Sequence, residues 1–127
     1  FVGIFASYLQ AIMKKAYHLT QCSTCQRILN KLNWQGKLQD IRTEKISAEQ
    51  LDLMANMSGS YETLFSRRAM KYKSMGLKDK SLSEKDYRQL ILGEDTFLKR
   101  PVFIVNDKIF IGNSKKTVEA LSAVLNE

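Results

Sequence analysis

The sequence predicts an α/β protein in which four strands form one mixed sheet and a block of helices interrupts the order of the strands. Two observations predict this class. Several stretches carry apolar residues at helical spacing, whereas a few short runs alternate or are continuously apolar, as strands are. Capping residues and glycines separate these stretches. The resulting order is strand–helix–strand, then a helical block, then strand–strand–helix.

The first part of this order is a strand–helix–strand unit. Residues 16–19 predict a short strand, and the apolar residues within 28–32 have helical spacing. A stop signal at residues 33–36 ends that helix, and the alternating residues 37–42 predict a second strand. Such a unit favours two parallel strands joined by a right-handed crossover.

The pattern is helical from about residue 46 to residue 95. Ser47 and Gln50 form a capping box, Ser83 caps a further helix, and glycines mark the helix ends. We expect three or four short helices in this insertion, one of them over residues 67–75.

The C-terminal part predicts a hairpin followed by a helix. Pro101, the single proline of the chain, opens an apolar strand that runs to residue 105. Asn106-Asp107 predicts a turn, and residues 108–111 predict the returning arm. Ser114 then caps the last helix.

Composition limits the kinds of protein that this chain can be. With 127 residues, 44% of them hydrophobic and 26% charged, it has the make-up of one globular domain. The net charge of +7 favours anionic partners such as oxyanions or acidic proteins, and no nucleic-acid-binding motif accompanies it. No apolar run approaches the length of a membrane helix, so we expect no membrane association.

Residues 1–12 form an apolar extension ahead of Met13. The stretch is too short to span a bilayer, and no basic segment precedes it as in a signal peptide. We expect it to pack on a surface of its own domain or of a neighbouring copy, and we assign no chemistry to it. Residues 13–127 are expected to form a single domain with its helical insertion over about 46–95.

Both cysteines lie in Cys22-Ser23-Thr24-Cys25, between the first strand and the first helix. Cys22 therefore falls at the first residues of the helix, where unpaired N–H groups and the positive end of the helix dipole favour a thiolate. Cys25 follows one turn later on the same face, close enough to form a disulfide once Cys22 is oxidised. This spacing is typical of a redox pair in a reducing cytoplasm.

Three competing roles for the cysteine pair are less favoured. A structural zinc site needs about four ligands, and the chain offers two cysteines and one histidine. A structural disulfide across so short a span constrains little chain entropy. Two inert buried thiols remain the third alternative, which the polar neighbouring residues disfavour. We expect no bound metal or cofactor.

Several short motifs follow one another along the chain. They are Cys22-Ser23-Thr24-Cys25-Gln26-Arg27, Asp40-Ile41-Arg42, Leu64-Phe65-Ser66-Arg67-Arg68, Tyr72 through Gly76-Leu77, Lys99-Arg100-Pro101-Val102, and Gly112. Each motif alone is weak, but the ordered set, from Met13 to about Glu127, resembles the ArsC/Spx family of glutaredoxin-linked arsenate reductases and their relatives. The resemblance implies a thioredoxin-like fold with a helical insertion, and a cis peptide bond before Pro101.

The resemblance also implies roles for individual residues. In the arsenate reductases of the family, the cysteine that matches Cys22 attacks the oxyanion, while arginines hold the anion and lower the cysteine pKa. Arg100 matches one of these arginines. A second arginine of the family corresponds to Arg67 or Arg68. Arsenate-reducing members have an arginine at the position of Ser66, whereas Spx-like members have one at the position of Arg68.

Two features depart from the arsenate reductase pattern. A third arginine follows the hairpin in the best-matching arsenate reductases, where this chain has Gly112-Asn113. Glutathione-linked arsenate reductases typically have one cysteine in the loop, whereas the Spx branch has two and uses them as a redox switch. Here Cys25 would resolve an adduct on Cys22 internally, with thioredoxin or glutaredoxin as the recycling partner.

These residues support two main hypotheses. The first is a cytoplasmic thiol-dependent oxidoreductase that resembles arsenate reductase, with Cys22 as nucleophile and Cys25 as candidate resolving cysteine. It would take electrons from glutathione and glutaredoxin or from thioredoxin, and its substrate would be a small oxyanion. The second is an Spx-like redox-sensing regulator that binds RNA polymerase, and a general protein disulfide reductase is a third alternative. His18 stays outside the predicted site, because a lone histidine on a strand more often packs than reacts.

Overall fold

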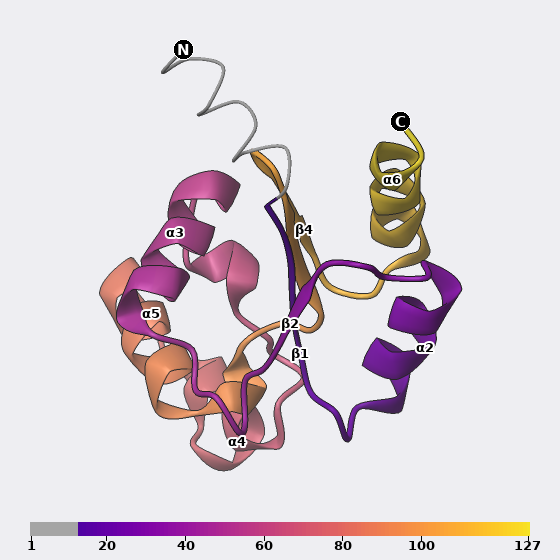
Figure 1. Ribbon diagram of the computed structural model, residues 1–127. Helices are drawn as coiled ribbons and strands as arrows, with labels where there is room; N and C mark the ends of the chain where they lie inside the picture. Colours follow the sequence, from indigo (N-terminus) through magenta and orange to yellow (C-terminus); the bar gives the residue numbers. More distant parts are fainter. Residues whose placement is uncertain (1–12) are drawn as a thin grey trace. The chain divides into compact units, whose positions relative to one another are not determined.

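The computed structural model describes residues 13–127, which form two compact units (Figure 1). The first unit contains residues 13–41 and 100–127 and holds four strands and two helices. The second unit, Arg42–Lys99, is the helical segment that interrupts the first in the sequence. The expected packing of residues 1–12 lies outside the described residues.

The first unit is built on a mixed sheet. Its strands are β1 (Lys14–His18), β2 (Lys37–Asp40), β3 (Val102–Val105) and β4 (Lys108–Ile111). They lie in the order β2-β1-β3-β4, in which β1 and β2 are parallel and the other neighbouring pairs are antiparallel. This confirms the predicted α/β class with a four-stranded mixed sheet in a thioredoxin-like arrangement.

Several strand boundaries differ from the prediction by one or two residues. β1 starts at Lys14 because backbone pairing with Val105 does not depend on the polarity of the side chain. β2 ends at Asp40, where the chain turns, although the N–H of Ile41 still donates to the carbonyl of His18 at 3.0 Å. β3 is buried along its whole length, as expected for a continuous apolar run in a central strand.

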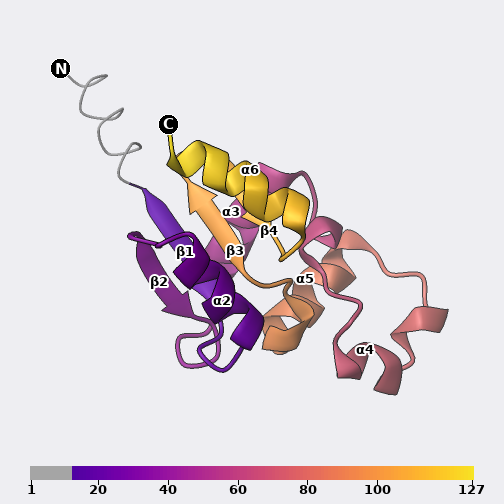
Figure 2. The ribbon, with the colours of Figure 1, turned by 90° about the vertical axis from the view of Figure 1, so that its right-hand side faces the viewer.

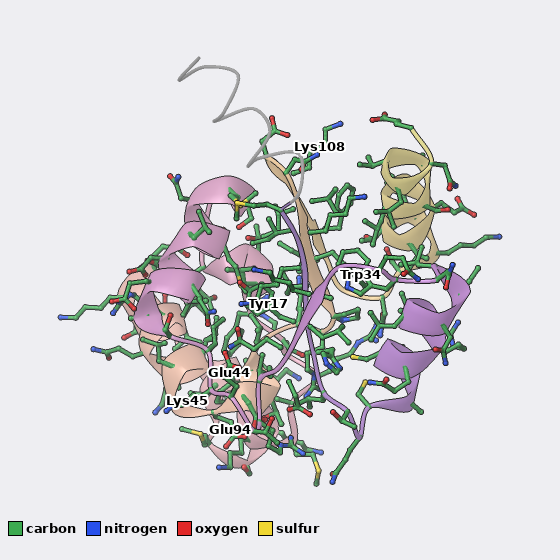
Figure 3. The ribbon with its side chains drawn as sticks, in the orientation of Figure 1. Tyr17, Trp34, Glu44, Lys45, Glu94 and Lys108 are labelled. Carbon is green, nitrogen blue, oxygen red and sulfur yellow. The ribbon has the colours of Figure 1, made fainter. Side chains whose placement is uncertain are left out.

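Two helices, α2 (Ser23–Lys31) and α6 (Lys115–Leu125), cover one face of the sheet and lie side by side in Figure 2. Between them and the strands lies a core cluster whose buried members are Ala16, Ile28, Leu29, Phe103, Val105, Val118 and Leu121. Trp34, labelled in Figure 3, packs edge-on against Phe103 with ring centroids 4.9 Å apart. The core fixes α2, and with it the cysteine pair at the start of this helix.

Gly36 lies where no side chain fits. A Cβ added there would be 2.6 Å from the carbonyl oxygen of Lys14 and 2.6 Å from the ring of Trp34. We expect Gly36→Ala to lower the free energy of unfolding by about 1–3 kcal/mol, because the added methyl group forces one of these neighbours to move. Urea unfolding measures this loss. Gly93→Ala is the control, since a Cβ there meets nothing within 4 Å, and an equal loss in the control would contradict the prediction.

The second unit contains three α-helices and three 3-10 turns. The helices are α3 (Ala48–Ser58), α4 (Met70–Ser74) and α5 (Glu84–Gly93), and the turns are Glu62–Leu64, Leu77–Asp79 and Asp95–Phe97. The predicted capping box at Ser47 and Gln50 is present, and Ser83 caps α5. No helix among residues 13–127 is both long and apolar enough to cross a membrane.

The helix predicted over residues 67–75 is shorter in the structure, spanning only Met70–Ser74. Residues 67–69 form turns instead of a helix, and the backbone of the two residues before them pairs with a distant segment. Phe65 forms a β-bridge with Leu98, and the N–H of Ser66 donates to the carbonyl of Phe97 at 2.7 Å. Such long-range pairing outweighs local helix propensity.

Aromatic packing and ion pairs hold the second unit together. The fully buried ring of Phe65 contacts the rings of Tyr72, Tyr87 and Phe97, with centroids 4.9–5.9 Å apart. Near the two ends of the unit, Arg42 donates to both carboxylate oxygens of Asp95 at 3.0 and 3.1 Å. A bidentate ion pair therefore links the first residue of this unit with a residue close to its last.

Candidate active site

Cys22 occupies the N-cap position of α2. Its backbone is extended (φ −87°, ψ 105°), and its Sγ accepts a hydrogen bond from the N–H of Cys25 at 3.4 Å. The N–H of Cys22 in turn donates to the carbonyl of Leu19 at 3.0 Å. A sulfur at an N-cap receives donors that the helix leaves unpaired, and this one is partly exposed.

Opposing effects set the pKa of Cys22. Partial burial raises it, but the N–H and thiol of Cys25, the charge of Arg100 and the N–H of Thr24 all lower it. Together they hold the pKa of the Cys22 thiol below its ordinary value. Because the thiolate is the reactive form, this residue has the properties of a nucleophile.

Cys25 has the opposite character. Its side chain is fully buried, and this burial raises the pKa of the Cys25 thiol to about 12. The N–H of Leu19 lowers this pKa and the neighbouring Cys22 raises it, while Arg100 lowers it again. The two cysteines are both free, so at neutral pH the pair combines a thiolate-forming sulfur with a protonated thiol.

Arg100 and Pro101 directly precede β3 in the first unit. The peptide bond between them is cis, and the carbonyl of Pro101 accepts from the N–H of Gly112 at 2.9 Å. This hydrogen bond ties the entry of β3 to the exit of β4. The positive charge of Arg100 lowers the pKa of both cysteine thiols.

The contribution of Arg100 can be measured by the alkylation rate of Cys22 as a function of pH in a Cys25→Ser background. We expect a midpoint below about 8.5, the value of a free thiol, because the backbone donors and the guanidinium favour the thiolate. Arg100→Met removes the positive charge, so the midpoint should move to higher pH. Lys99→Met removes the adjacent exposed charge and serves as the control; an equal shift in both variants would contradict a specific effect of Arg100.

Arg67 and Arg68 belong to the second unit. Arg67 donates to Glu62 at 2.8 Å and to the Tyr87 hydroxyl at 3.0 Å, and its ion pair with Glu62 raises the pKa of its guanidinium. Arg68 is exposed, and its guanidinium has no ion pair or hydrogen bond within residues 13–127. The structure thus brings the two cysteines together with Arg100, whereas Arg67 is engaged with a carboxylate of its own unit.

Sequence reasoning missed a hydrogen-bonded group behind the cysteine pair. The Nε2 of Gln26 lies 3.2 Å from the Nδ1 of the buried His18 and donates to the carbonyl of Leu19 at 3.0 Å. Asp40, at the end of β2, accepts from the N–H of Thr20 at 2.9 Å. One signal in the sequence pointed to Gln26. It follows Cys22 by four residues, so both side chains lie on the same face of the helix.

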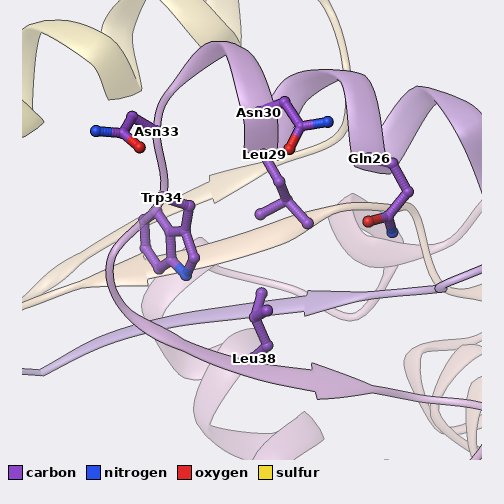
Figure 4. A pocket seen from close by; sticks show the side chains of 6 residues that line it. All are labelled: Gln26, Leu29, Asn30, Asn33, Trp34 and Leu38. Carbon is purple, nitrogen blue, oxygen red and sulfur yellow. The ribbon is translucent and has the colours of Figure 1, made fainter.

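A shallow hollow lies beside α2 rather than at the cysteines (Figure 4). It is lined by Gln26, Leu29, Asn30, Asn33, Trp34 and Leu38. Gln26 is the residue that this hollow shares with the surroundings of the cysteine pair. Among residues 13–127, no three His, Cys, Asp or Glu side chains gather as metal ligands would.

Bacterial proteins resemble this chain over most of its length. The uncharacterized protein YfgD of Escherichia coli (strain K12) is 28% identical over 109 residues, which make up 82% of this chain and 92% of that protein. The structure of a possible arsenate reductase from Streptococcus mutans UA159 superposes with a TM-score of 0.68 at 28% identity. That match covers 87% of this chain and 98% of the other.

The fold has a further match in the structure of the YFFB protein, with a TM-score of 0.75 at 20% identity over 89% of this chain and 99% of that chain. At this identity the likeness concerns the fold alone. The model of the ArsC family matches residues 17–121, from the strand before the cysteine pair into the last helix. Because this match spans most of the chain, the protein belongs to the ArsC family.

Proposed function

We propose that this protein is a thiol-dependent oxidoreductase that reduces a small oxyanion of the arsenate type, with Cys22 as its nucleophile. The observation that carries the proposal is the sulfur of Cys22 at the N-cap of α2, with N–H donors and the charge of Arg100 around it. The same groups that favour a thiolate also favour an incoming anion.

In the first step, the Cys22 thiolate attacks the arsenic atom of arsenate. A sulfur–arsenic bond forms, and one oxygen leaves as water after taking up protons. Arg100 would bind the anion through its guanidinium, whose planar fork suits an oxyanion. The resemblance assigns a second anion contact to Arg67 or Arg68, and of these two residues Arg67 already forms an ion pair with Glu62.

In the second step, the sulfur of Cys25 attacks the sulfur of Cys22. A disulfide forms, and the electron pair of the sulfur–arsenic bond stays on arsenic, which leaves as arsenite. Two thiols thus lose two electrons and two protons, while arsenate gains two electrons and loses one oxygen as water. Formation of the adduct removes the charge of Cys22, which is one of the causes that raise the pKa of Cys25 and would make its deprotonation easier at this stage.

An external thiol donor must then reduce the disulfide between Cys22 and Cys25. Thioredoxin or glutaredoxin with glutathione would supply the two electrons, which suits a protein that works in a reducing cytoplasm. The presence of Cys25 beside Cys22 favours a donor that reduces a disulfide within the protein.

A second function, an Spx-like regulator that binds RNA polymerase, is favoured by the second cysteine of the Cys22–Cys25 pair and by a missing arginine. After β4 the chain has Gly112-Asn113, so the hairpin supplies no arginine for an oxyanion. With fewer fixed cations the anion would bind less strongly. In this case, formation of the Cys22–Cys25 disulfide would change the affinity for the polymerase.

Arsenate-dependent oxidation of NADPH tests the enzyme. The assay is run once with glutathione, glutaredoxin and glutathione reductase, and once with thioredoxin and its reductase. Turnover that needs arsenate supports the proposal and identifies the donor. Lack of turnover with both donors would overturn it, and binding to the C-terminal domain of the polymerase α-subunit in one redox state alone would then establish the regulator.

A further inference from the structure

The carboxylate of Asp40 makes a contact beside the cysteine loop that the proposed reaction does not use. Asp40 is the last residue of β2 and the first residue of the Asp40-Ile41-Arg42 motif. Its Oδ2 accepts from the N–H of Thr20 at 2.9 Å. We propose that Asp40 is a positioning residue, which holds the turn that carries Cys22 at the N-cap of α2. The inference rests on the proposed function only in taking Cys22 as the nucleophile.

A β-turn connects β1 with α2 and ends at Cys22. The N–H of Cys22 donates to the carbonyl of Leu19 at 3.0 Å, and the two residues between them, Thr20 and Gln21, form the turn. This hydrogen bond leaves the N–H of Thr20, the second residue of the turn, without a partner inside the turn. Asp40 supplies the acceptor from the neighbouring strand. The turn is therefore closed by its own backbone and held from outside by a carboxylate.

The position of Asp40 is fixed by the sheet. The residues on either side of it, Gln39 and Ile41, are buried. Asp40 lies opposite His18 in the parallel pairing of β1 with β2, and the N–H of Ile41 donates to the carbonyl of His18 at 3.0 Å. The backbone on both sides of the carboxylate is thus held in place. Its side chain is a well-positioned acceptor for the turn, two residues beyond the end of β1.

The turn determines where the sulfur of Cys22 lies. That sulfur accepts from the N–H of Cys25 at 3.4 Å, a contact that depends on the extended backbone of Cys22 at the N-cap. A turn that moves more freely carries Cys22 away from this arrangement for part of the time. The sulfur then loses N–H donors that favour its thiolate. Asp40 therefore acts on Cys22 through the backbone of Thr20.

The position and the charge of this carboxylate predict opposite effects. A negative charge near a thiol disfavours the thiolate, so removal of the charge alone lowers the pKa of Cys22. Loss of the N-cap arrangement raises this pKa, because the donors that stabilise the thiolate are withdrawn. The charge of Arg100, which lowers the pKa of Cys22, is present in both cases. The direction of the change thus distinguishes a positioning residue from a nearby charge.

The experiment measures the alkylation rate of Cys22 as a function of pH in the Cys25→Ser background. We expect Asp40→Ala to raise the midpoint by roughly half to one pH unit, which corresponds to one weak hydrogen bond to sulfur. Well below both midpoints, the rate should fall by about three- to tenfold, since the thiolate fraction changes tenfold for each unit of pKa.

Two further variants complete the comparison. Asp40→Asn keeps an oxygen that accepts from the N–H of Thr20, so its midpoint should be no higher than that of the protein with Asp40. Asp107→Ala is the matched control, because it removes an exposed carboxylate of the same unit from the turn between β3 and β4. The control should leave the midpoint unchanged.

Three outcomes would overturn the inference. They are an unchanged or lower midpoint in Asp40→Ala, an equal rise in Asp40→Asn, or an equal rise in Asp107→Ala. A second measurement needs no substitution of Asp40. The amide proton of Thr20 should change its NMR chemical shift as the carboxyl group of Asp40 is protonated, and a signal that does not follow this titration would also refute the proposal. Neither experiment uses an oxyanion, so a failure of arsenate reduction would leave their results interpretable.

Discussion

Replacement of Cys22 by serine is expected to abolish oxyanion reduction, with a rate at least roughly a thousandfold below that of the unchanged protein. The N-cap geometry, the N–H of Cys25 and the charge of Arg100 favour a thiolate at this one position. A serine hydroxyl stays protonated there and cannot form the sulfur–arsenic bond. The measurement is the rate of arsenate-dependent NADPH oxidation at saturating donor, for Cys22→Ser and the unchanged protein in parallel.

Cys25→Ser separates the nucleophile from the resolving residue. This variant keeps the sulfur of Cys22 and its position, so the first step should survive. Glutathione in solution can then attack the adduct in place of Cys25, and activity should persist in part with glutathione and glutaredoxin but fall strongly with thioredoxin. An active Cys22→Ser protein together with an inactive Cys25→Ser protein would assign the nucleophile to Cys25 and refute the prediction.

Phe65→Ala is expected to lower the free energy of unfolding by about 3–5 kcal/mol. The ring of Phe65 is completely buried and contacts three other aromatic rings, so its removal leaves a cavity that those rigid neighbours fill poorly. Urea unfolding followed by circular dichroism measures the loss.

An exposed residue of the same unit provides the control for this core substitution. The side chain of Met70 is 89% exposed, so Met70→Ala removes little buried surface. Its effect should stay within about 0.5 kcal/mol. If Phe65→Ala cost no more than Met70→Ala, the aromatic cluster would not be the core of the second unit.

Much of the fold follows from local sequence signals. Alternation and continuous apolar runs located the four strands, and the capping box at Ser47 and the cap at Ser83 located the starts of α3 and α5. The position of Cys22 was also predictable, because a strand followed at once by a helix leaves its connecting residue at the N-cap. These features depend on residues that are close together in the chain.

The features that could not be predicted depend on contacts between distant residues. The backbone of Phe65 and Ser66 pairs with residues more than thirty positions away, directly before the helix that proved shorter than expected. The pairing of Gln26 with His18 depends on how the chain turns between strand and helix. Arg67 donates to Glu62, but nothing in the sequence indicates that Arg67 rather than Arg68 makes this contact.

The link between Arg42 and Asp95 bears on how the chain folds. The central strands pair residues that are far apart in the sequence, such as Tyr17 and Val102. Closing so long a loop from the unfolded chain costs entropy, and contacts of this kind slow folding. A second unit that forms early, with its ends joined by Arg42 and Asp95, would replace a long flexible loop by a short connection. The order of events would then be helical insertion first and central strand pairing last.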